Sequence, residues 1–520
     1  MKFDLLIKNG SVLDGTGGSA IRADVGICGE RIAAVGDLSK AEADQIIDAI
    51  GQTVCPGFID VHSHSDAYLL IDPRASSKVF QGITTEVCGN CGASVSPRLG
   101  DAKLPSDWQD KPFPGTWSTV AEYRNLFEQV KPAVNEALLI GHNTLHRGIC
   151  GYEPRGATPD ELKAMCRALE QALDEGGCGM STGLIYPPAS AVPREEVIEL
   201  SKICAAKNKI YTSHMRSEGK QLLEAIDEAL DIGRRSGARV QISHLKTSGQ
   251  ANWHKIDAAL EKIEAAIAEG LEVAADRYPY TAACTDLDII LPDWALYDGK
   301  DAVLARLADS KVRKKIRDEI LEGRGEFGFS TVMIGSTEHP ENHTLQGMVL
   351  EEAAKQLGME PVDALLHIIE KDELRTGGIF FGMCEENMWR ILAQPWVMIG
   401  CDASLRAPDG ILSKDHPHPR AYGSFTKLLR ASLDGQTVPL PEMIRKMTSL
   451  AAEQFRLKDR GILKKGNFAD VVVFDPAKIK ENTTYQAPHQ LSGGITTLLI
   501  NGTVTIQGGR LTGQRNGKFL

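Results

Sequence analysis

The middle of the chain alternates short apolar runs with helix-like stretches, and this alternation limits the possible fold more than any other feature of the sequence. Helical periodicity is clearest at residues 159–175, 221–236 and 255–269. Apolar runs of strand length occur at residues 54–61, 137–141, 178–182, 210–214, 240–244, 273–278 and 397–402. Strands and helices that alternate at this spacing predict an α/β fold, namely a TIM-like (β/α)8 barrel.

The two ends of the chain have a different pattern. Residues 1–55 and 460–520 contain short strand-like runs with hairpin signals such as Asn9-Gly10 and Asn501-Gly502. We therefore expect both ends to form one small β-sandwich domain beside a metal-dependent barrel at residues 56–459. A charged helical run interrupts the barrel rhythm at about residues 287–350, and we expect an insertion there.

The net charge and the cysteine content indicate which classes of binding partner and which cellular compartment to expect. The formal net charge of −11 leaves no basic surplus for binding nucleic acid or an anionic membrane. No stretch approaches the roughly 18 uncharged apolar residues of a membrane span, and the first nine residues are too short and too charged for a signal peptide. The eleven cysteines suit free thiols or metal ligands. We expect a cytoplasmic protein with a small-molecule substrate, and the sequence allows a homo-oligomer.

Ligand-type side chains end several of the predicted strands. His62 and His64 lie two residues apart after the first apolar run, so their side chains point to the same side. His214, His244 and Asp402 end three later runs. The strand ends of a barrel meet at one mouth, where catalytic groups gather. Four imidazoles and a carboxylate at one mouth indicate Zn²⁺ or a similar divalent ion with a coordination position open to water.

Further blocks of sequence follow the His62 segment in a fixed order. They are GNCG at residues 89–92, GLIYPP at 183–188, SHMRSEG at 213–219, SHLKTSG at 243–249, DRYPYTA at 276–282 and HPRAYG at 418–423. Over nearly its whole length the chain thus resembles the amidohydrolase superfamily and, within it, the N-acyl-D-amino-acid deacylases. The resemblance implies a zinc-dependent hydrolase that cleaves N-acyl-D-amino acids, on a barrel with a flanking β domain and a long insertion.

The resemblance also implies a set of metal ligands. Many relatives bridge two metals with a carboxylated lysine at the end of strand 4, but here that strand ends in Ser181 and Thr182. In deacylases that this chain resembles, the cysteine of the GNCG block binds zinc, which points to Cys91, with Cys88 as a weaker candidate. The implied tight zinc site is Cys91, His214 and His244. The implied second site, weak or partly occupied, is His62, His64 and Asp402.

Roles in catalysis and substrate binding follow from the same resemblance. Asp402 is expected to take a proton from water and to deliver it to the leaving amine, first as a general base and then as a general acid. The free α-carboxylate of an N-acyl-amino acid needs cationic and hydroxyl partners. Lys246 matches the family lysine for this task, and Tyr186, Tyr278 and Arg420 lie in matching blocks.

The segment at residues 281–294 bears on the preferred side chain of the substrate. It leads into the insertion and contains apolar residues beside Asp286 and Asp288, but no Arg or Lys. We therefore expect neutral, mainly apolar D-amino acids to be preferred over acidic ones.

The alternatives on the same fold are a cyclic-amide hydrolase of the hydantoinase or dihydroorotase kind and a dipeptidase. A non-catalytic barrel scaffold is the alternative from a different class.

Overall fold

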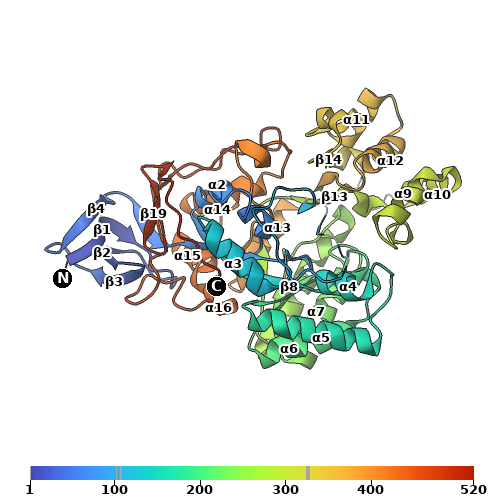
Figure 1. The fold of residues 1–520 in the computed structure, drawn as a ribbon. Coiled ribbons are helices and arrows are strands. Elements are labelled where there is room, and N and C mark those ends of the chain that lie inside the picture. The colour runs from blue at the N-terminus through green and yellow to red at the C-terminus, as the bar shows by residue number, and fades with distance from the viewer. Residues whose placement is uncertain (1, 101, 103, 106–107, 324–327) are drawn as a thin grey trace.

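Eight parallel strands in the middle of the chain form the barrel (Figure 1). The structure is a computed structural model that describes residues 2–100, 102, 104–105, 108–323 and 328–520. In barrel order the strands are β6 (Phe58–Asp60), β7 (Ile83–Cys88), β8 (Asn135–Gly141), β9 (Gly179–Gly183), β10 (Ile210–His214), β11 (Arg239–Ile242), β12 (Val273–Arg277) and β16 (Val397–Ile399). The barrel closes where the Asp402 N–H donates to the His62 carbonyl at 2.8 Å. The expected fold class is confirmed.

The first two barrel strands differ in detail from the expectation. The run at residues 54–61 divides between β5 (Thr53–Pro56), which belongs to another sheet, and β6. Pro56 has no N–H to continue the ladder, and Gly57 packs so closely on Thr84 that an added Cβ would lie 2.2 Å from its Oγ1. Strand β7 was not among the expected strands, because its middle is Thr-Thr-Glu, yet all of its residues are buried.

Helices cover the outside of the barrel. The expected helices are confirmed to within one residue at each end as α5 (Pro159–Asp174), α7 (Leu222–Ser236) and α8 (Ile256–Ala268). Helix α5 begins with a capping box between Thr158 and Glu161, which satisfies backbone N–H groups of its first turn. The other helices outside the insertion are α1 (Asp66–Leu69), α2 (Ser76–Val79), α3 (Val120–Val130), α4 (His142–Cys150), α6 (Arg194–Ala206), α13 (Glu385–Ala393), α14 (Arg420–Leu433), α15 (Leu440–Met447) and α16 (Ser449–Gln454).

A nine-stranded sheet joins the two ends of the chain, blue and red at one side of Figure 1. Its strands are β1 (Lys2–Val12), β2 (Ile21–Cys28), β3 (Arg31–Gly36), β4 (Glu42–Asp48), β5, β17 (Val471–Phe474), β18 (Ile495–Ile500), β19 (Thr503–Gln507) and β20 (Arg510–Leu511). Strand β5 pairs with β1 on one side and with β17 on the other. Both termini thus build one β unit with its own apolar core, while the exact domain boundaries stay a prediction.

An inserted unit separates the last two barrel strands, β12 and β16. It contains a three-stranded antiparallel sheet of β13 (Ala282–Asp286), β14 (Val332–Ile334) and β15 (Gly377–Phe381). Its helices, far from the nine-stranded sheet in Figure 1, are α9 (Lys300–Ala308), α10 (Ser310–Glu322), α11 (Leu350–Leu357) and α12 (Pro361–Lys371). The unit has a core of its own, and the described residues of the expected insertion, 287–323 and 328–350, belong to this unit. Residues of this unit and of the barrel mouth line one cavity of about 1500 Å³.

Candidate metal centre

The six expected metal ligands converge at the carboxyl end of the barrel. His62 and His64 follow β6, Asp402 follows β16, and Cys91 lies in the loop after β7. His214 is the last residue of β10, and His244 lies two residues beyond β11. Cys88 ends β7 fully buried and is not part of either cluster described below.

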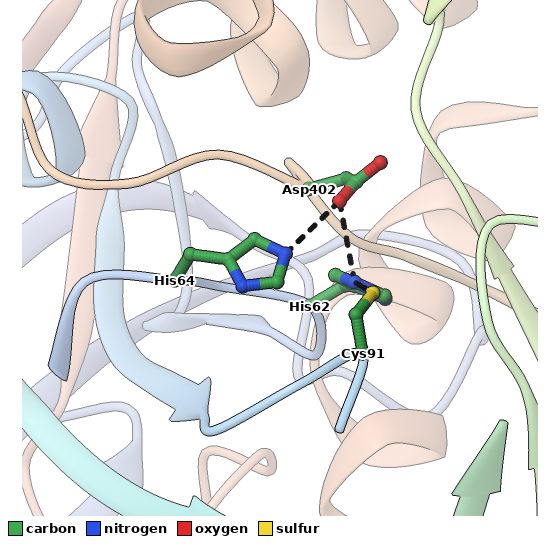
Figure 2. A group of neighbouring side chains, drawn as sticks. All are labelled: His62, His64, Cys91 and Asp402. Atoms are coloured by element: carbon green, nitrogen blue, oxygen red, sulfur yellow. Dashed lines mark hydrogen bonds and ion pairs between the residues drawn. The ribbon is translucent and has the colours of Figure 1, made fainter. Parts of the chain in front are cut away.

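The ligand atoms form two clusters that share the sulfur of Cys91. In the first cluster, His244 Nε2 lies 3.5 Å from the sulfur and 2.9 Å from His214 Nδ1. In the second, shown in Figure 2, the Asp402 carboxylate faces the rings of His62 and His64. Its Oδ1 is 3.3 Å from His62 Nε2 and 3.2 Å from His64 Nε2. His62 Nε2 is 3.3 Å from the sulfur, so Cys91 can contribute to both clusters.

Three of these residues have a backbone conformation that non-glycine residues rarely adopt. Cys91, His244 and Asp402 have φ values of 53°, 36° and 53°. Each such conformation costs on the order of 1 kcal/mol, and residues of this kind concentrate at functional sites. We infer that the surrounding packing and hydrogen bonds hold these three residues in a strained conformation, and that this conformation serves the function of the site rather than the stability of the fold.

The Cys91 loop packs against the end of strand β9, the fourth strand of the barrel, which ends without a lysine in this chain. Ser181 of β9 donates to the Gly89 carbonyl at 2.5 Å and accepts from the Gly92 N–H at 3.0 Å. A Cβ on Gly183 would lie 2.2 Å from the Cys91 carbonyl oxygen. The loop therefore packs directly against the end of the fourth barrel strand, and this packing fixes the position of the Cys91 thiol.

Burial and neighbouring charges determine the protonation of the cluster. Burial would raise the pKa of the Cys91 thiol, but His62, His214 and His244 outweigh it and hold that pKa well below the usual value. Burial also opposes ionisation of Asp402, yet Arg420, His244 and His62 hold its pKa well below the usual range. The site thus presents a thiolate and a carboxylate, the forms in which these two groups bind metals. Burial opposes a charge on His62 and His64, but the same anions raise the pKa values of both rings.

Two carboxylates that the sequence analysis did not select support the histidines from behind. Asp276, at the end of β12, lies 3.2 Å from His62 Nδ1 and accepts the His244 N–H at 2.9 Å. Glu218 lies 2.7 Å from His244 Nδ1. A carboxylate on the outer nitrogen fixes the ring and leaves the inner nitrogen free to bind a metal. Glu218 follows His214 by four residues, and Asp276 ends a barrel strand, so both positions carried a usable signal.

The donor set fits zinc. One thiolate, four imidazoles and one carboxylate are the ligand types that Zn²⁺ prefers, and they lie within bridging distance of one another. Two imidazole nitrogens, His214 Nδ1 and His244 Nε2, lie 2.9 Å apart. Their lone pairs would repel each other at this distance unless a proton or a metal cation lies between them. Residues that fit the metal are therefore already gathered around one sulfur.

Lys246 and Tyr278, two of the four expected substrate ligands, lie together in the cavity wall. The Lys246 ammonium donates to Glu218 at 2.5 Å and lies 2.8 Å from His244 Nδ1, so at least one of its three N–H donors stays available. The Tyr278 hydroxyl is buried and has no hydrogen-bond partner within the described residues. The ammonium lies 5.9 Å from the centre of the Tyr278 ring. Both side chains thus keep a donor available for a ligand.

Tyr186 and Arg420 line the same cavity. The Tyr186 hydroxyl lies 3.1 Å from Thr285 Oγ1 of β13, and its ring packs edge-on against His214. Arg420 forms an ion pair with Asp402 Oδ2 at 2.7 Å and donates to the Cys284 carbonyl at 3.0 Å. These contacts attach strand β13 of the inserted unit to the metal centre. The pairing of Arg420 with Asp402 was not expected.

The segment at residues 281–294 only partly faces the cavity. Ile289 and Ile290 line it, whereas Leu287 and Leu291 are buried in the core of the inserted unit. Asp286 and Asp288 also line the cavity, and so does Arg147, a cation that the sequence analysis did not select. Burial raises the pKa of Asp288 to about 6 despite the nearby Arg147.

Comparisons with known proteins show the family of this chain. The model of the amidohydrolase family matches residues 45–199 and 401–506. A D-aminoacylase of Alcaligenes xylosoxydans xylosoxydans is 37% identical over 100% of this chain and 97% of its own length. An N-acyl-D-glutamate deacylase of the same organism is 38% identical over 96% of this chain and 93% of its own length. Within the described residues, no helix is long and apolar enough to cross a membrane.

A solved structure extends the similarity to the whole fold. The crystal structure of an N-acyl-D-glutamate deacylase from Bordetella bronchiseptica superposes with a TM-score of 0.85 at 32% identity and covers all of both chains. That protein was crystallised with zinc and a phosphonate inhibitor that mimics the tetrahedral intermediate of its reaction. On the full-length identity and the match of the family model, the chain belongs to the amidohydrolase family.

Proposed function

We propose that the protein is a zinc-dependent hydrolase that cleaves N-acyl-D-amino acids into a carboxylate and a free D-amino acid. The observation that carries this proposal is the pair of clusters sharing the Cys91 sulfur at the bottom of a cavity lined with cations and hydroxyls. The relatives with 37% and 38% identity are deacylases of this kind. The absence of a strand-4 lysine and the presence of the Cys91 loop favour linear amides over cyclic ones.

The two clusters differ in how they would hold zinc. We assign the tight site to Cys91, His214 and His244, because one thiolate and two imidazoles leave a coordination position open. His62, His64 and Asp402, with the shared sulfur, form the second and weaker site. Zinc in such a site polarises a carbonyl oxygen and makes water more acidic, so that the amide can be attacked at neutral pH.

Asp402 is the residue that moves the proton. Its pKa lies well below the usual range, so the carboxylate is charged at neutral pH and can accept a proton from the attacking water. The ion pair with Arg420 holds the carboxylate against the cavity wall. The same group can then deliver the proton to the leaving amine, which completes the exchange.

The substrate carboxylate would bind where donors remain. Lys246 has at least one unused N–H and Tyr278 an unused hydroxyl, and both lie beside the first cluster. Tyr186 and Arg420 extend this wall along β13. A free α-carboxylate held there would place the scissile amide beside the metal ligands, which explains why the site carries more cations than a neutral amide needs.

Replacing Lys246 with alanine tests this assignment. A hydrogen bond to a charged group contributes about 1.5–3 kcal/mol, so kcat/KM for N-acetyl-D-methionine should fall on the order of 10- to 100-fold. The corresponding carboxamide, which lacks the charge, should lose little. Glu218→Gln is compared in parallel, because it keeps the ammonium but acts through His244, so it should lower turnover of both substrates alike. An equal loss on both substrates in Lys246→Ala would make this lysine structural.

The side-chain preference remains the expectation drawn from residues 281–294. A carboxylate of a D-Glu or D-Asp substrate would meet Asp286 and Asp288, with the cation Arg147 near them. We predict that N-acetyl derivatives of D-Leu, D-Met and D-Phe have a kcat/KM about tenfold or more above that of N-acetyl-D-Glu, because an uncompensated carboxylate is costly to desolvate. The variant Asp288→Asn should narrow this ratio. N-acetyl-D-Glu as the best substrate of the series would contradict the prediction and would indicate Arg147 as its partner.

A substrate panel separates the proposal from its alternatives. Turnover is measured on N-acetyl-D- and N-acetyl-L-amino acids, a 5-substituted hydantoin, dihydroorotate and a dipeptide. The proposal predicts hydrolysis of the N-acetyl-D series only. Faster turnover of a cyclic amide or of the dipeptide would favour the corresponding alternative, and no turnover on any substrate would favour a scaffold.

We also propose that the protein acts in the cytoplasm. All eleven cysteines are free in the structure, and the thiol of Cys91 must stay reduced to bind zinc. A homo-oligomer stays a prediction from the sequence.

A further inference from the structure

Three charged side chains lie completely buried behind the second metal cluster and have no part in the proposed chemistry. They are Asp60 on β6, Lys78 on α2 and Glu86 on β7, each with 0% exposure. The Lys78 ammonium lies 3.0 Å from Asp60 Oδ2 and 2.9 Å from Glu86 Oε1. Burying charges in this way is expensive and rarely improves stability over apolar packing, so the group calls for another explanation.

Lys78 connects the two backbone segments that carry the second cluster. Besides its two carboxylate partners, it donates to the Ala403 carbonyl at 3.1 Å, directly after Asp402. Asp60 uses its other oxygen to accept the N–H of His62 at 3.2 Å and the N–H of Cys401 at 2.8 Å. Asp60 and Lys78 together therefore fix the end of the first barrel strand relative to the end of the last one.

Glu86 holds the same segment from the side of strand β7. Its Oε1 accepts the hydroxyls of Ser63 at 2.6 Å and Ser65 at 2.8 Å. These serines stand on either side of His64, so the carboxylate determines the backbone position from which His64 projects. Lys78 binds the same oxygen at 2.9 Å and places a positive charge beside this buried carboxyl group.

The first metal cluster is supported by different groups. Ser181 holds the Cys91 loop, Glu218 holds His244, and Asp276 binds the His244 backbone. Within the described part of the chain, Lys78 makes no hydrogen bond or ion pair with Cys91, His214 or His244. Asp276 thus contacts both clusters, because it also lies 3.2 Å from His62 Nδ1, whereas Lys78 supports the second cluster alone.

From these contacts we propose that Lys78 is a positioning residue that sets the zinc affinity of the second cluster, His62, His64 and Asp402, independently of the first. The inference rests on the metal centre of the proposed function. Loss of Lys78 would release the Ala403 carbonyl and leave two buried carboxylates without their cation. The segment after β6, which carries His62 and His64, could then shift relative to the segment after β16, which carries Asp402. The first cluster would keep its ligands and its supports.

The test compares Lys78→Met with Lys446→Met in the full-length protein. Lys446 is also fully buried, and it donates to the carbonyls of Gln394 and Val397 at the opposite end of strand β16. Metal-free protein is titrated with zinc, the two binding steps are followed by calorimetry, and bound metal is measured after dialysis. In Lys78→Met we expect the first step to keep its affinity and the second to weaken about 10- to 100-fold, the range found when groups behind metal ligands are removed. Lys446→Met should lower the melting temperature and leave both steps unchanged.

A second variant covers the case in which Lys78→Met does not fold. Lys78→Met/Glu86→Gln removes one positive and one negative charge, so the buried group keeps its net charge while the contact with Ala403 is lost. It should show the same selective weakening. Unchanged affinity at the second step, an equal loss at both steps, or a wild-type protein that binds only one zinc would each overturn the inference. Turnover of N-acetyl-D-methionine by wild-type protein with its first zinc is recorded separately, so a failure of the proposed function is recognised on its own.

Discussion

Replacing Cys91 with alanine is expected to remove bound zinc and to lower kcat/KM by on the order of 1000-fold or more, because metal activation of water and carbonyl is lost. The effect should be this large because the sulfur belongs to both clusters, 3.3 Å from His62 Nε2 and 3.5 Å from His244 Nε2. Without the thiolate, each cluster loses the ligand that joins it to the other. The measurement is zinc content per chain together with turnover of N-acetyl-D-methionine.

Cys88→Ala is the matched control for this variant. Its thiol is fully buried three residues earlier in the chain, and burial, followed by nearby carboxylates, raises its pKa well above the usual value. A neutral buried thiol does not bind metal, so Cys88→Ala should keep its zinc and most of its activity, with some loss of stability from the small cavity. Full zinc and full turnover in Cys91→Ala would contradict the assignment of Cys91.

Replacing Asp402 with asparagine is expected to lower kcat on the order of 100- to 10,000-fold, the range of a positioned general acid–base group. Asparagine keeps the shape of the side chain and one oxygen near His62 and His64, but it cannot accept the proton. KM should change much less than kcat, since the substrate carboxylate binds elsewhere. Steady-state kinetics over a range of pH values, with tight-site zinc content verified, measures both.

The control for Asp402→Asn is Asp415→Asn. Asp415 lines the same cavity and pairs with Arg406 at 2.5 Å, much as Asp402 pairs with Arg420 at 2.7 Å. Loss of an aspartate–arginine pair alone should therefore affect both variants, whereas loss of proton transfer should affect only Asp402→Asn. A near-normal kcat in Asp402→Asn would mean that another group transfers the proton.

The sequence predicted the barrel because its buried parallel strands are mostly continuous apolar runs, which are recognisable one at a time. Strand β7 was missed for a physical reason. Its Glu86 is polar in sequence but buried in the structure, where Lys78 and two serines satisfy it. Charge compensation of this kind joins residues from different elements, so no local pattern of one strand reveals it.

The six expected metal ligands were selected from the sequence, whereas the groups that support them were not. Each ligand ends an apolar run or lies in a distinctive block, so its position along the chain carries the signal. Asp276 and Glu218 act only through the histidines that they contact, and the ion pair of Arg420 with Asp402 was not predicted. Likewise, the sharing of Cys91 between two clusters depends on how its loop packs on β9, which is a three-dimensional property.

Reconstitution of metal-free protein with zinc tests the central claim most directly. Chelated protein is titrated with zinc while the hydrolysis of N-acetyl-D-methionine and of its L enantiomer is followed in parallel. The proposed metal centre predicts no turnover before zinc is added, turnover of the D enantiomer that rises with the first molar equivalent, and little or no turnover of the L enantiomer. Full activity of the chelated protein, or equal turnover of both enantiomers, would contradict a zinc-dependent deacylase of D-amino acids.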